Sequence, residues 1–189
     1  MEQLWAPWRV ELVDQPNEQH TSGCVFCTLP RVQAEAGQRA ARDREALVLG
    51  RTEHTFALIN RWPYNNGHIM VIPRRHTNKL DELQGDEWTE LQEMLRIANG
   101  IVTEAYRPQG TNLGMNLGRP AGAGIEDHLH WHLVPRWNGD TNFMPVLGDV
   151  KVMIEHLTAS WDRMRPLFDA RFHRGPAVSE WPAEDGGKK

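Results

Sequence analysis

The chain has 189 residues, of which 40% are hydrophobic and 24% are charged, and its formal net charge is −4. This length is enough for one domain with a hydrophobic core and too small for two large ones. The acidic balance argues against a general nucleic-acid binder, which needs a basic excess, and no apolar run approaches the roughly 18–20 residues that cross a bilayer.

Residues 1–23 are expected to form an irregular N-terminal lead-in. The stretch MEQLWAPWRVELVDQ has no basic head followed by an apolar core, so we expect no secretory signal. Cys24 and Cys27 follow, and two cysteines are too few for a disulfide framework. A C-x-x-C pair in a cytosolic protein more often binds a metal or acts in redox chemistry. We therefore predict a cytoplasmic protein.

Three strands are expected next, after a short helix in the Ala-, Arg- and Glu-rich stretch 31–45. The apolar runs at 46–50 and 55–60 predict two strands, and HIMVIP at 68–73 predicts a third. RWPYNNG lies between the last two strands, and its proline and Asn-Gly pair are turn signals. The spacing predicts an antiparallel meander.

A long helix is expected over residues 81–106, beginning at Gly85–Asp86 with Asp86 as candidate N-cap and ending before Pro108. Its apolar residues recur at helical spacing: Trp88, Leu91, Met94, Leu95, Ile97, Ala98, Ile101 and Val102. NLGMNLG at 112–118 predicts a strand, and the glycine-rich loop 119–127 follows it.

The C-terminal part predicts one more strand at 128–136, a helix at 148–172 and a polar tail at 173–189 that we expect to be disordered. Residues 24–172 would then form one domain. Strands with two main helices, and no regular βαβ alternation, predict an α+β fold on an antiparallel sheet.

The stretch HLHWH carries three histidines at alternate positions, His128, His130 and His132. Side chains alternate between the faces of a strand, so the three imidazoles are expected in a row on one face, roughly 6–7 Å apart. Leu129, Trp131 and Leu133 would point into a core. An exposed face that carries histidine by accident is the alternative, and strict alternation beside a glycine-rich loop argues against it.

Two chemistries fit such a row. Three neutral imidazoles and a water make a catalytic zinc site. Alternatively, an imidazole attacks phosphorus and splits one hard displacement into two easier ones. The surroundings favour phosphate chemistry, because backbone N–H groups near Gly118, Gly122 and Gly124 can bind an anion. His68, directly after Asn-Gly, would add a fourth imidazole.

HLHWHLV resembles the signature of the histidine triad (HIT) family, His-x-His-x-His-x-x with apolar x, and TFALINRWPYNNGHIMVIPRRH resembles the first half of that family. The resemblance covers roughly residues 20–140. LWAPWR, GMNLGRPAGAG and VPRWNGDTNFMPV are most similar to the bacterial diadenosine tetraphosphate (Ap4A) phosphorylase branch. The resemblance implies a sheet of about five antiparallel strands with two main helices, and a homodimer.

The resemblance also implies an enzyme that cleaves diadenosine polyphosphates through a covalent nucleotidyl-histidine. By position, His130 would attack the α-phosphorus, and His132 and His68 would contact the α-phosphate. Asn60 stands where members contact the ribose, and Asn116 where a polar residue contacts the phosphate chain. The glycines of the loop, Gly122 and Gly124 among them, would approach the phosphates.

The second substrate and the leaving group stay open. Members that use phosphate as acceptor carry a Gly-Ser pair in the loop before the triad, where this chain has Ala123–Gly124. Water and phosphate are therefore both candidate acceptors. Adenosine phosphoramidates are the alternative substrates. A nucleotide-binding sensor with incidental turnover is the alternative from another class.

For the cysteine pair, the resemblance implies a structural zinc ion bound by Cys24, Cys27, His76 and His128. Two free thiols are the alternative. A redox dithiol would need a thioredoxin-like βαβ context that the sequence lacks. We expect no organic cofactor and no nucleic-acid partner.

Overall fold

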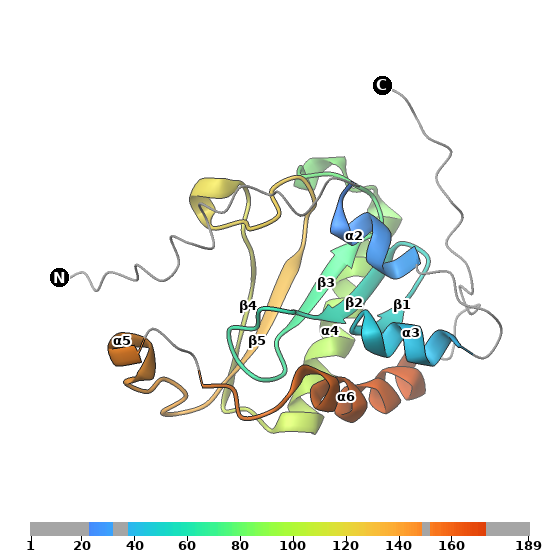
Figure 1. Cartoon of the computed structure of the whole chain (residues 1–189). Coiled ribbons are helices and arrows are strands. Elements are labelled where there is room, and N and C mark those ends of the chain that lie inside the picture. The colour runs from blue at the N-terminus through green and yellow to red at the C-terminus, as the bar shows by residue number, and fades with distance from the viewer. Residues whose placement is uncertain (1–22, 32–37, 149–151, 173–189) are drawn as a thin grey trace.

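The computed structural model describes residues 23–31, 38–148 and 152–172 (Figure 1). The expectations for the lead-in up to residue 22 and for the tail from residue 173 lie outside the described residues. In the ranges that are described, no helix combines the length and apolar character that a membrane crossing requires.

A five-stranded antiparallel sheet forms the centre of the fold, in the order β1-β2-β3-β5-β4. The strands are β1 Val48–Arg51, β2 Thr55–Ile59, β3 Ile69–Pro73, β4 Gly110–Met115 and β5 Trp131–Arg136. Every residue of β2 and β3 is buried, which explains why these strands read as continuous apolar runs. The predicted meander and the α+β fold class are confirmed.

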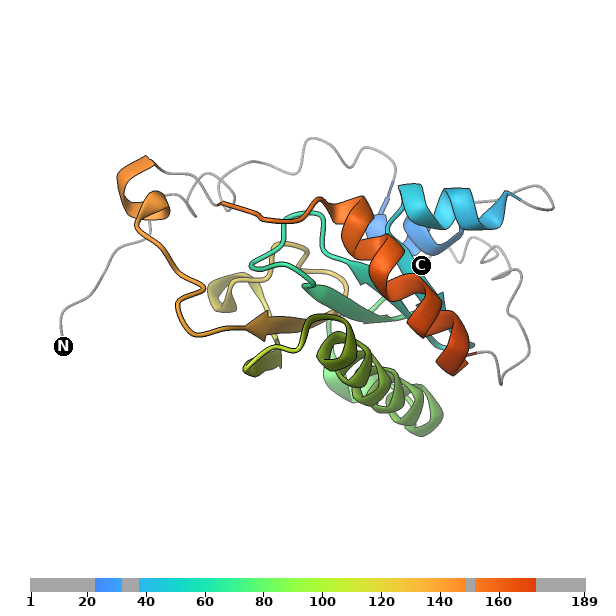
Figure 2. The same cartoon turned by 90° about the horizontal axis from the view of Figure 1, so that it is seen from below.

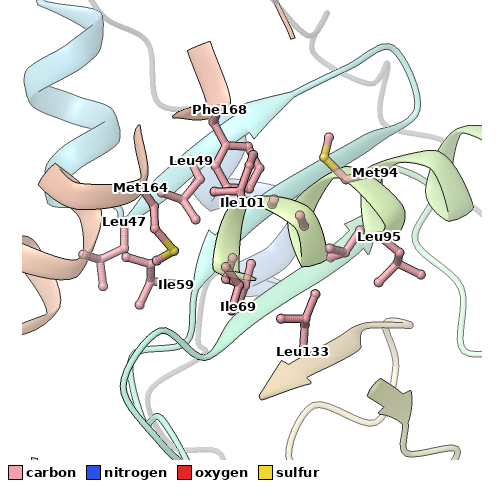
Figure 3. Close-up of a cluster of buried hydrophobic side chains, with 14 of the residues drawn as sticks. Leu47, Leu49, Ile59, Ile69, Met94, Leu95, Ile101, Leu133, Met164 and Phe168 are labelled. Carbon is pink, nitrogen blue, oxygen red and sulfur yellow. The ribbon is translucent and has the colours of Figure 1, made fainter. Parts of the chain in front are cut away.

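Helices α4 and α6 cover one face of the sheet and contact each other. Their buried side chains meet those of the strands in the main core, shown in Figure 3. The helices of the described ranges are α2 Val25–Thr28, α3 Arg39–Glu45, α4 Gly85–Tyr106, α5 Met144–Gly148 and α6 Leu157–Phe172, with short 3-10 turns at Leu29–Arg31, Leu80–Glu82 and Arg119–Ala121. The C-terminal helix therefore begins later than its predicted start at residue 148.

The start of α4 differs from the expected one. Gln84, rather than Asp86, is the N-cap, because the Glu87 carboxylate accepts a hydrogen bond from the Gln84 N–H at 2.8 Å. This satisfies one of the backbone donors that a helix start leaves free. At the other end α4 stops before Pro108 as predicted, and Arg107 caps it in a left-handed conformation (φ 47°).

The last two strands are shorter than predicted. β4 ends at Met115, so Asn116 lies in the loop. β5 begins at Trp131, so two of the three histidines precede the strand. The reason is that the chain before Trp131 bonds elsewhere: the Leu129 N–H donates to the Thr77 carbonyl at 2.8 Å instead of to a strand.

The second face of the sheet is covered by α2, which lies on the opposite side of the sheet from α4 (Figure 2). Phe26 of α2 is 2% exposed and packs into a smaller core. The other buried members of that core are Ala46, Val48, Phe56, Leu58, Met70 and Ile72. This face carries the triad, because Phe26 also contacts the rings of His128 and His130.

A buried charge network fastens the layers together. The Asp43 carboxylate of α3 accepts hydrogen bonds from Arg51 of β1 at 2.7 Å and from Arg165 of α6 at 2.9 Å. Only 3% of the Asp43 side chain is exposed. One carboxylate thus bridges two guanidinium groups from different elements, and Arg165 also pairs with Asp169 at 2.7 Å.

Candidate active site

The three histidines of HLHWH lie where β5 begins, beside the start of β3. His128 and His130 are buried, at 1% and 4% exposure, and the ring centroids of His130 and His132 are 5.0 Å apart. His68 is fully buried, and its ring lies 5.1 Å from that of His132. The structure therefore brings together the four imidazoles that the sequence singled out. Leu133 points into the main core, as the alternation predicted.

The position of one proton makes His130 a potential nucleophile. Its Nδ1 lies 2.8 Å from the carbonyl oxygen of His128. A carbonyl oxygen only accepts, so Nδ1 of His130 must carry the hydrogen and donate it. A neutral imidazole has one N–H, and the second nitrogen, Nε2, then keeps a free lone pair.

His132 carries its hydrogen on Nε2 rather than on Nδ1, because of its hydrogen bond with His68. The Tyr64 N–H donates to Nδ1 of His68 at 3.0 Å, so a neutral His68 carries its hydrogen on Nε2. That Nε2 lies 2.9 Å from Nδ1 of His132 and donates to it. The hydrogen of a neutral His132 is thereby placed on its Nε2. His132 is then a hydrogen-bond donor, as contact with a phosphate oxygen requires.

The rings of His130 and His132 are both neutral at physiological pH. Burial lowers the pKa of His130 below its usual value, against the opposing effect of its hydrogen bond to His128. Burial, and then repulsion by His130, lower the pKa of His132 to about 4. The tautomers assigned above are therefore the relevant forms, because a protonated imidazole would offer no lone pair for attack.

The glycine-rich loop has two positions that need glycine and one that does not. Gly118 and Gly122 adopt positive φ angles of 79° and 94°, where a side chain is strained. The Asn116 amide donates to the Gly122 carbonyl at 3.2 Å and so holds the loop. Gly124 has no such φ angle, and a Cβ there would meet nothing within 4 Å. The open space at Gly124 is compatible with close approach of a ligand.

Asn60 is buried, and its amide faces His68 and the following turn. Its Oδ1 accepts from the Trp62 N–H at 3.0 Å, and its Nδ2 lies 3.4 Å from Nδ1 of His68. The Tyr64 ring stacks on that of His68, with centroids 4.8 Å apart. The sequence interpretation missed Tyr64 and Phe26, because their neighbours are set by folding and not by spacing. The turn signal RWPYNNG was the only local indication of Tyr64.

A second cluster adjoins the triad. The ligand atoms of Cys24, Cys27, His76 and His128 all lie within 4.8 Å of one another. The Nε2–H of His128 donates to the Pro73 carbonyl at 2.8 Å, so Nδ1 of a neutral His128 offers its lone pair to the cluster. The four groups come from α2 and its N-cap, from the segment after β3 and from the segment before β5. This is a site that could hold a metal ion.

The distances within the cluster are short and regular. His128 Nδ1 lies 3.4 Å from Cys24 Sγ, 3.6 Å from Cys27 Sγ and 3.3 Å from His76 Nδ1. Cys27 Sγ lies 3.4 Å from His76 Nδ1. Among the described residues, the group close enough to share a metal ion includes only one histidine of the triad. This arrangement argues against the alternative in which all three triad histidines bind a catalytic zinc.

Comparisons with known proteins agree with this architecture. A sequence profile of the HIT domain matches residues 41–139. AP-4-A phosphorylase of Mycobacterium tuberculosis is 35% identical over 159 residues, which cover 81% of this chain and 77% of that protein. Bis(5'-adenosyl)-triphosphatase of Dictyostelium discoideum is 27% identical over 132 residues, 67% of this chain and 88% of that protein. The crystal structure of a Zn-bound histidine triad family protein from Mycobacterium smegmatis superimposes with a TM-score of 0.59 at 22% identity, covering 79% of this chain and 95% of that one.

Proposed function

The chain belongs to the HIT domain family, and we propose that it cleaves diadenosine polyphosphates through a nucleotidyl intermediate on His130. The observation that carries this assignment is the hydrogen bond from His130 Nδ1–H to the His128 carbonyl, which leaves a lone pair on Nε2. The name of the mycobacterial relative supports the substrate class.

The reaction proceeds in two displacements at the α-phosphorus. Nε2 of His130 forms a bond to phosphorus, and the bond to the bridging oxygen breaks. The leaving nucleotide departs as an anion with that electron pair. The Nε2–H of His132, fixed by His68, donates to an α-phosphate oxygen and stabilises its growing charge.

In the second displacement an acceptor oxygen attacks the same phosphorus. The phosphorus–nitrogen bond breaks, and its electron pair returns to Nε2 of His130. Water as acceptor gives a nucleoside monophosphate and releases one proton to solvent. Inorganic phosphate as acceptor gives a nucleoside diphosphate. In this proposal Asn60 binds the ribose, and Asn116 orders the loop at Gly122 and Gly124 for the phosphates.

We propose that the ion in the cysteine–histidine cluster is zinc. Around a tetrahedral zinc with bonds of about 2.0 Å to nitrogen and about 2.3 Å to sulfur, two nitrogens lie about 3.3 Å apart and a nitrogen and a sulfur about 3.5 Å apart. The cluster has 3.3 Å between nitrogens and 3.4–3.6 Å between nitrogen and sulfur. Four protein ligands close the site, so zinc would supply structural cross-linking and no open position for substrate.

The proposal includes a cytoplasmic location, because zinc binding needs Cys24 and Cys27 as reduced thiolates.

The proposal also includes a homodimer. β4 is an edge strand of the described sheet, and Leu113 on it and Leu117 after it are 52% and 51% exposed. Exposed edges with apolar side chains favour pairing with a second copy. Light scattering should give a dimer mass that Leu113→Asp reduces to a monomer; a wild-type monomer would contradict this part.

A product assay tests the enzymatic proposal. Ap4A is incubated with the wild type, His130→Ala and the matched control His156→Ala, with and without inorganic phosphate. His156 is an exposed histidine at the start of α6, bonded to Thr158. We expect cleavage by the wild type and the control, and none by His130→Ala.

The products identify the acceptor. ADP plus ATP, formed only with phosphate, shows a phosphorylase, and AMP plus ATP without phosphate shows a hydrolase. Mass spectrometry of the wild type after a short reaction should find an added nucleotidyl group on His130. Full activity of His130→Ala would overturn the nucleophile. Cleavage of an adenosine phosphoramidate but not of Ap4A would overturn the substrate class.

A further inference from the structure

His128 belongs to the metal-binding cluster and to the nucleophile's surroundings at the same time. Its side-chain Nδ1 faces Cys24, Cys27 and His76 at 3.3–3.6 Å. Its main-chain oxygen accepts the hydrogen bond from Nδ1 of His130 at 2.8 Å. One residue therefore connects the position of a bound metal to the proton that decides which nitrogen of His130 is nucleophilic.

We propose that the metal-loaded cluster is a positioning device for His130, and that His128 acts as a positioning residue through its carbonyl group. The inference rests on the proposed function for its effect on rate. Its structural part, that metal binding sets the tautomer of His130, does not depend on the substrate.

The local backbone explains why such a device is needed. Residues 128–130 precede β5 and lack the ladder hydrogen bonds that would fix their peptide planes. The anchors of this segment include the cluster at His128 Nδ1, the His128 Nε2–H bond to Pro73 and the Leu129 N–H bond to Thr77. The cluster joins this segment to Cys24 and Cys27, more than 100 residues earlier in the chain, beside the ring contacts that Phe26 makes there.

Loss of the metal removes the anchor at His128 Nδ1. The ring of His128 then gains freedom about its side-chain torsions, and the peptide carbonyl beside it shifts. When that carbonyl no longer accepts from Nδ1 of His130, the hydrogen also populates Nε2, and the lone pair moves to the wrong nitrogen. Misplacement by about 1 Å costs on the order of 100-fold in rate at a catalytic centre.

His76 is the ligand best suited to test this coupling. It is an exposed ligand in the segment after β3, and its ring contacts His128 and the cluster. His54 provides a matched control, because both histidines line the same surface pocket of about 400 Å³ together with Arg74, Arg75 and Glu87. His54 lies outside the cluster. The variants are His76→Ala, His76→Cys, which keeps a ligand, and His54→Ala, all in the full chain.

The assays measure bound zinc, the melting temperature, the single-turnover rate of nucleotidyl transfer to His130 and the dissociation constant for AMP. Nitrogen-15 NMR of labelled histidine reports the tautomer of His130 without substrate. For His76→Ala we expect less zinc, a mixed tautomer and a rate lowered at least about tenfold. AMP affinity should change less than twofold. His54→Ala should keep the zinc, the tautomer and the rate, and His76→Cys should regain the zinc and the Nδ1–H tautomer that His76→Ala loses.

A zinc-depleted His76→Ala that keeps the pure Nδ1–H tautomer and the wild-type rate would overturn the proposal and leave the cluster a purely structural cross-link. If His76→Ala unfolds or retains zinc, chelator-treated wild type at a temperature below its melting point replaces it, and added Zn²⁺ must restore the tautomer. Absence of nucleotidyl transfer in the loaded wild type contradicts the proposed function alone, because the tautomer measurement still decides the coupling.

Discussion

Acid should destabilise the fold in part through His132. The folded protein lowers the pKa of this ring to about 4, first because it is buried and second because His130 lies beside it. His68 donates to its Nδ1, and Tyr64 covers it at 5.6 Å between ring centroids, so a second proton would have no acceptor on that side. Folding therefore selects the neutral ring.

The size and direction of the effect follow from proton linkage. In the unfolded chain the pKa of a histidine is about 6.5. Between pH 6.5 and 4 the unfolded chain binds a proton at this histidine that the folded chain excludes. The free energy of unfolding therefore decreases as the pH falls through this range. The contribution of His132 to stability is fully present above pH 6.5. For these two pKa values the loss from pH 8 to pH 5 is at most about 2 kcal/mol, because partial exposure of the ring weakens the effect.

Urea unfolding at pH 8, 6.5 and 5 measures this loss for the wild type and for His132→Asn. Asparagine does not titrate, whereas the other ionisable groups are the same in both proteins and cancel in the difference. The wild type should lose up to about 2 kcal/mol more than the variant between pH 8 and pH 5. Parallel pH profiles would show that folding does not exclude the proton from His132.

Four further substitutions test the glycine-rich loop, the buried charge network and the main core. Gly122→Ala should cost about 1–2 kcal/mol, because φ is 94° there, whereas Gly124→Ala should change the urea midpoint little; equal losses would contradict the loop geometry. Asp43→Asn should cost about 3 kcal/mol, because it removes the anion that pairs with the buried Arg51 guanidinium and one of the two carboxylates that pair with Arg165; a melting temperature equal to that of the wild type would argue against the network. Phe168→Ala removes a fully buried ring from the main core and should cost about 3–5 kcal/mol in the same urea assay, and a loss below about 1 kcal/mol would mean that the core is not closed there.

The sheet was predictable because its strands carry local patterns. Continuous apolar runs marked β2 and β3, and the helical spacing of buried residues marked α4. The boundaries failed where a distant partner decides them. β5 begins late because the chain before it bonds to Thr77 and to the cluster at Cys24, and α4 begins at a cap that depends on the Glu87 carboxylate.

The four imidazoles and the cysteine pair were also found from the sequence, since their spacing and residue types are visible there. Their hydrogen positions were not, because these depend on main-chain groups that only the fold brings near. The carbonyl that faces His130 belongs to a segment outside the strand, and the N–H that faces His68 belongs to the turn at Tyr64. No residue pattern encodes which of the two kinds of group meets a ring.

The His128 carbonyl acts on His130 directly, and the Tyr64 N–H acts on His132 through His68. As a result, the two neighbouring imidazoles carry their hydrogens on different nitrogens. At His130 the group at Nδ1 is an acceptor, so Nε2 holds a lone pair; at His132 the group at Nδ1 is a donor, so Nε2 holds a hydrogen. One ring can attack phosphorus while the other binds a phosphate oxygen, with no charge on either. The different roles of His130 and His132 are therefore set by the main-chain carbonyl of His128 and by the turn before β3, and the alternation of side chains along HLHWH reveals neither.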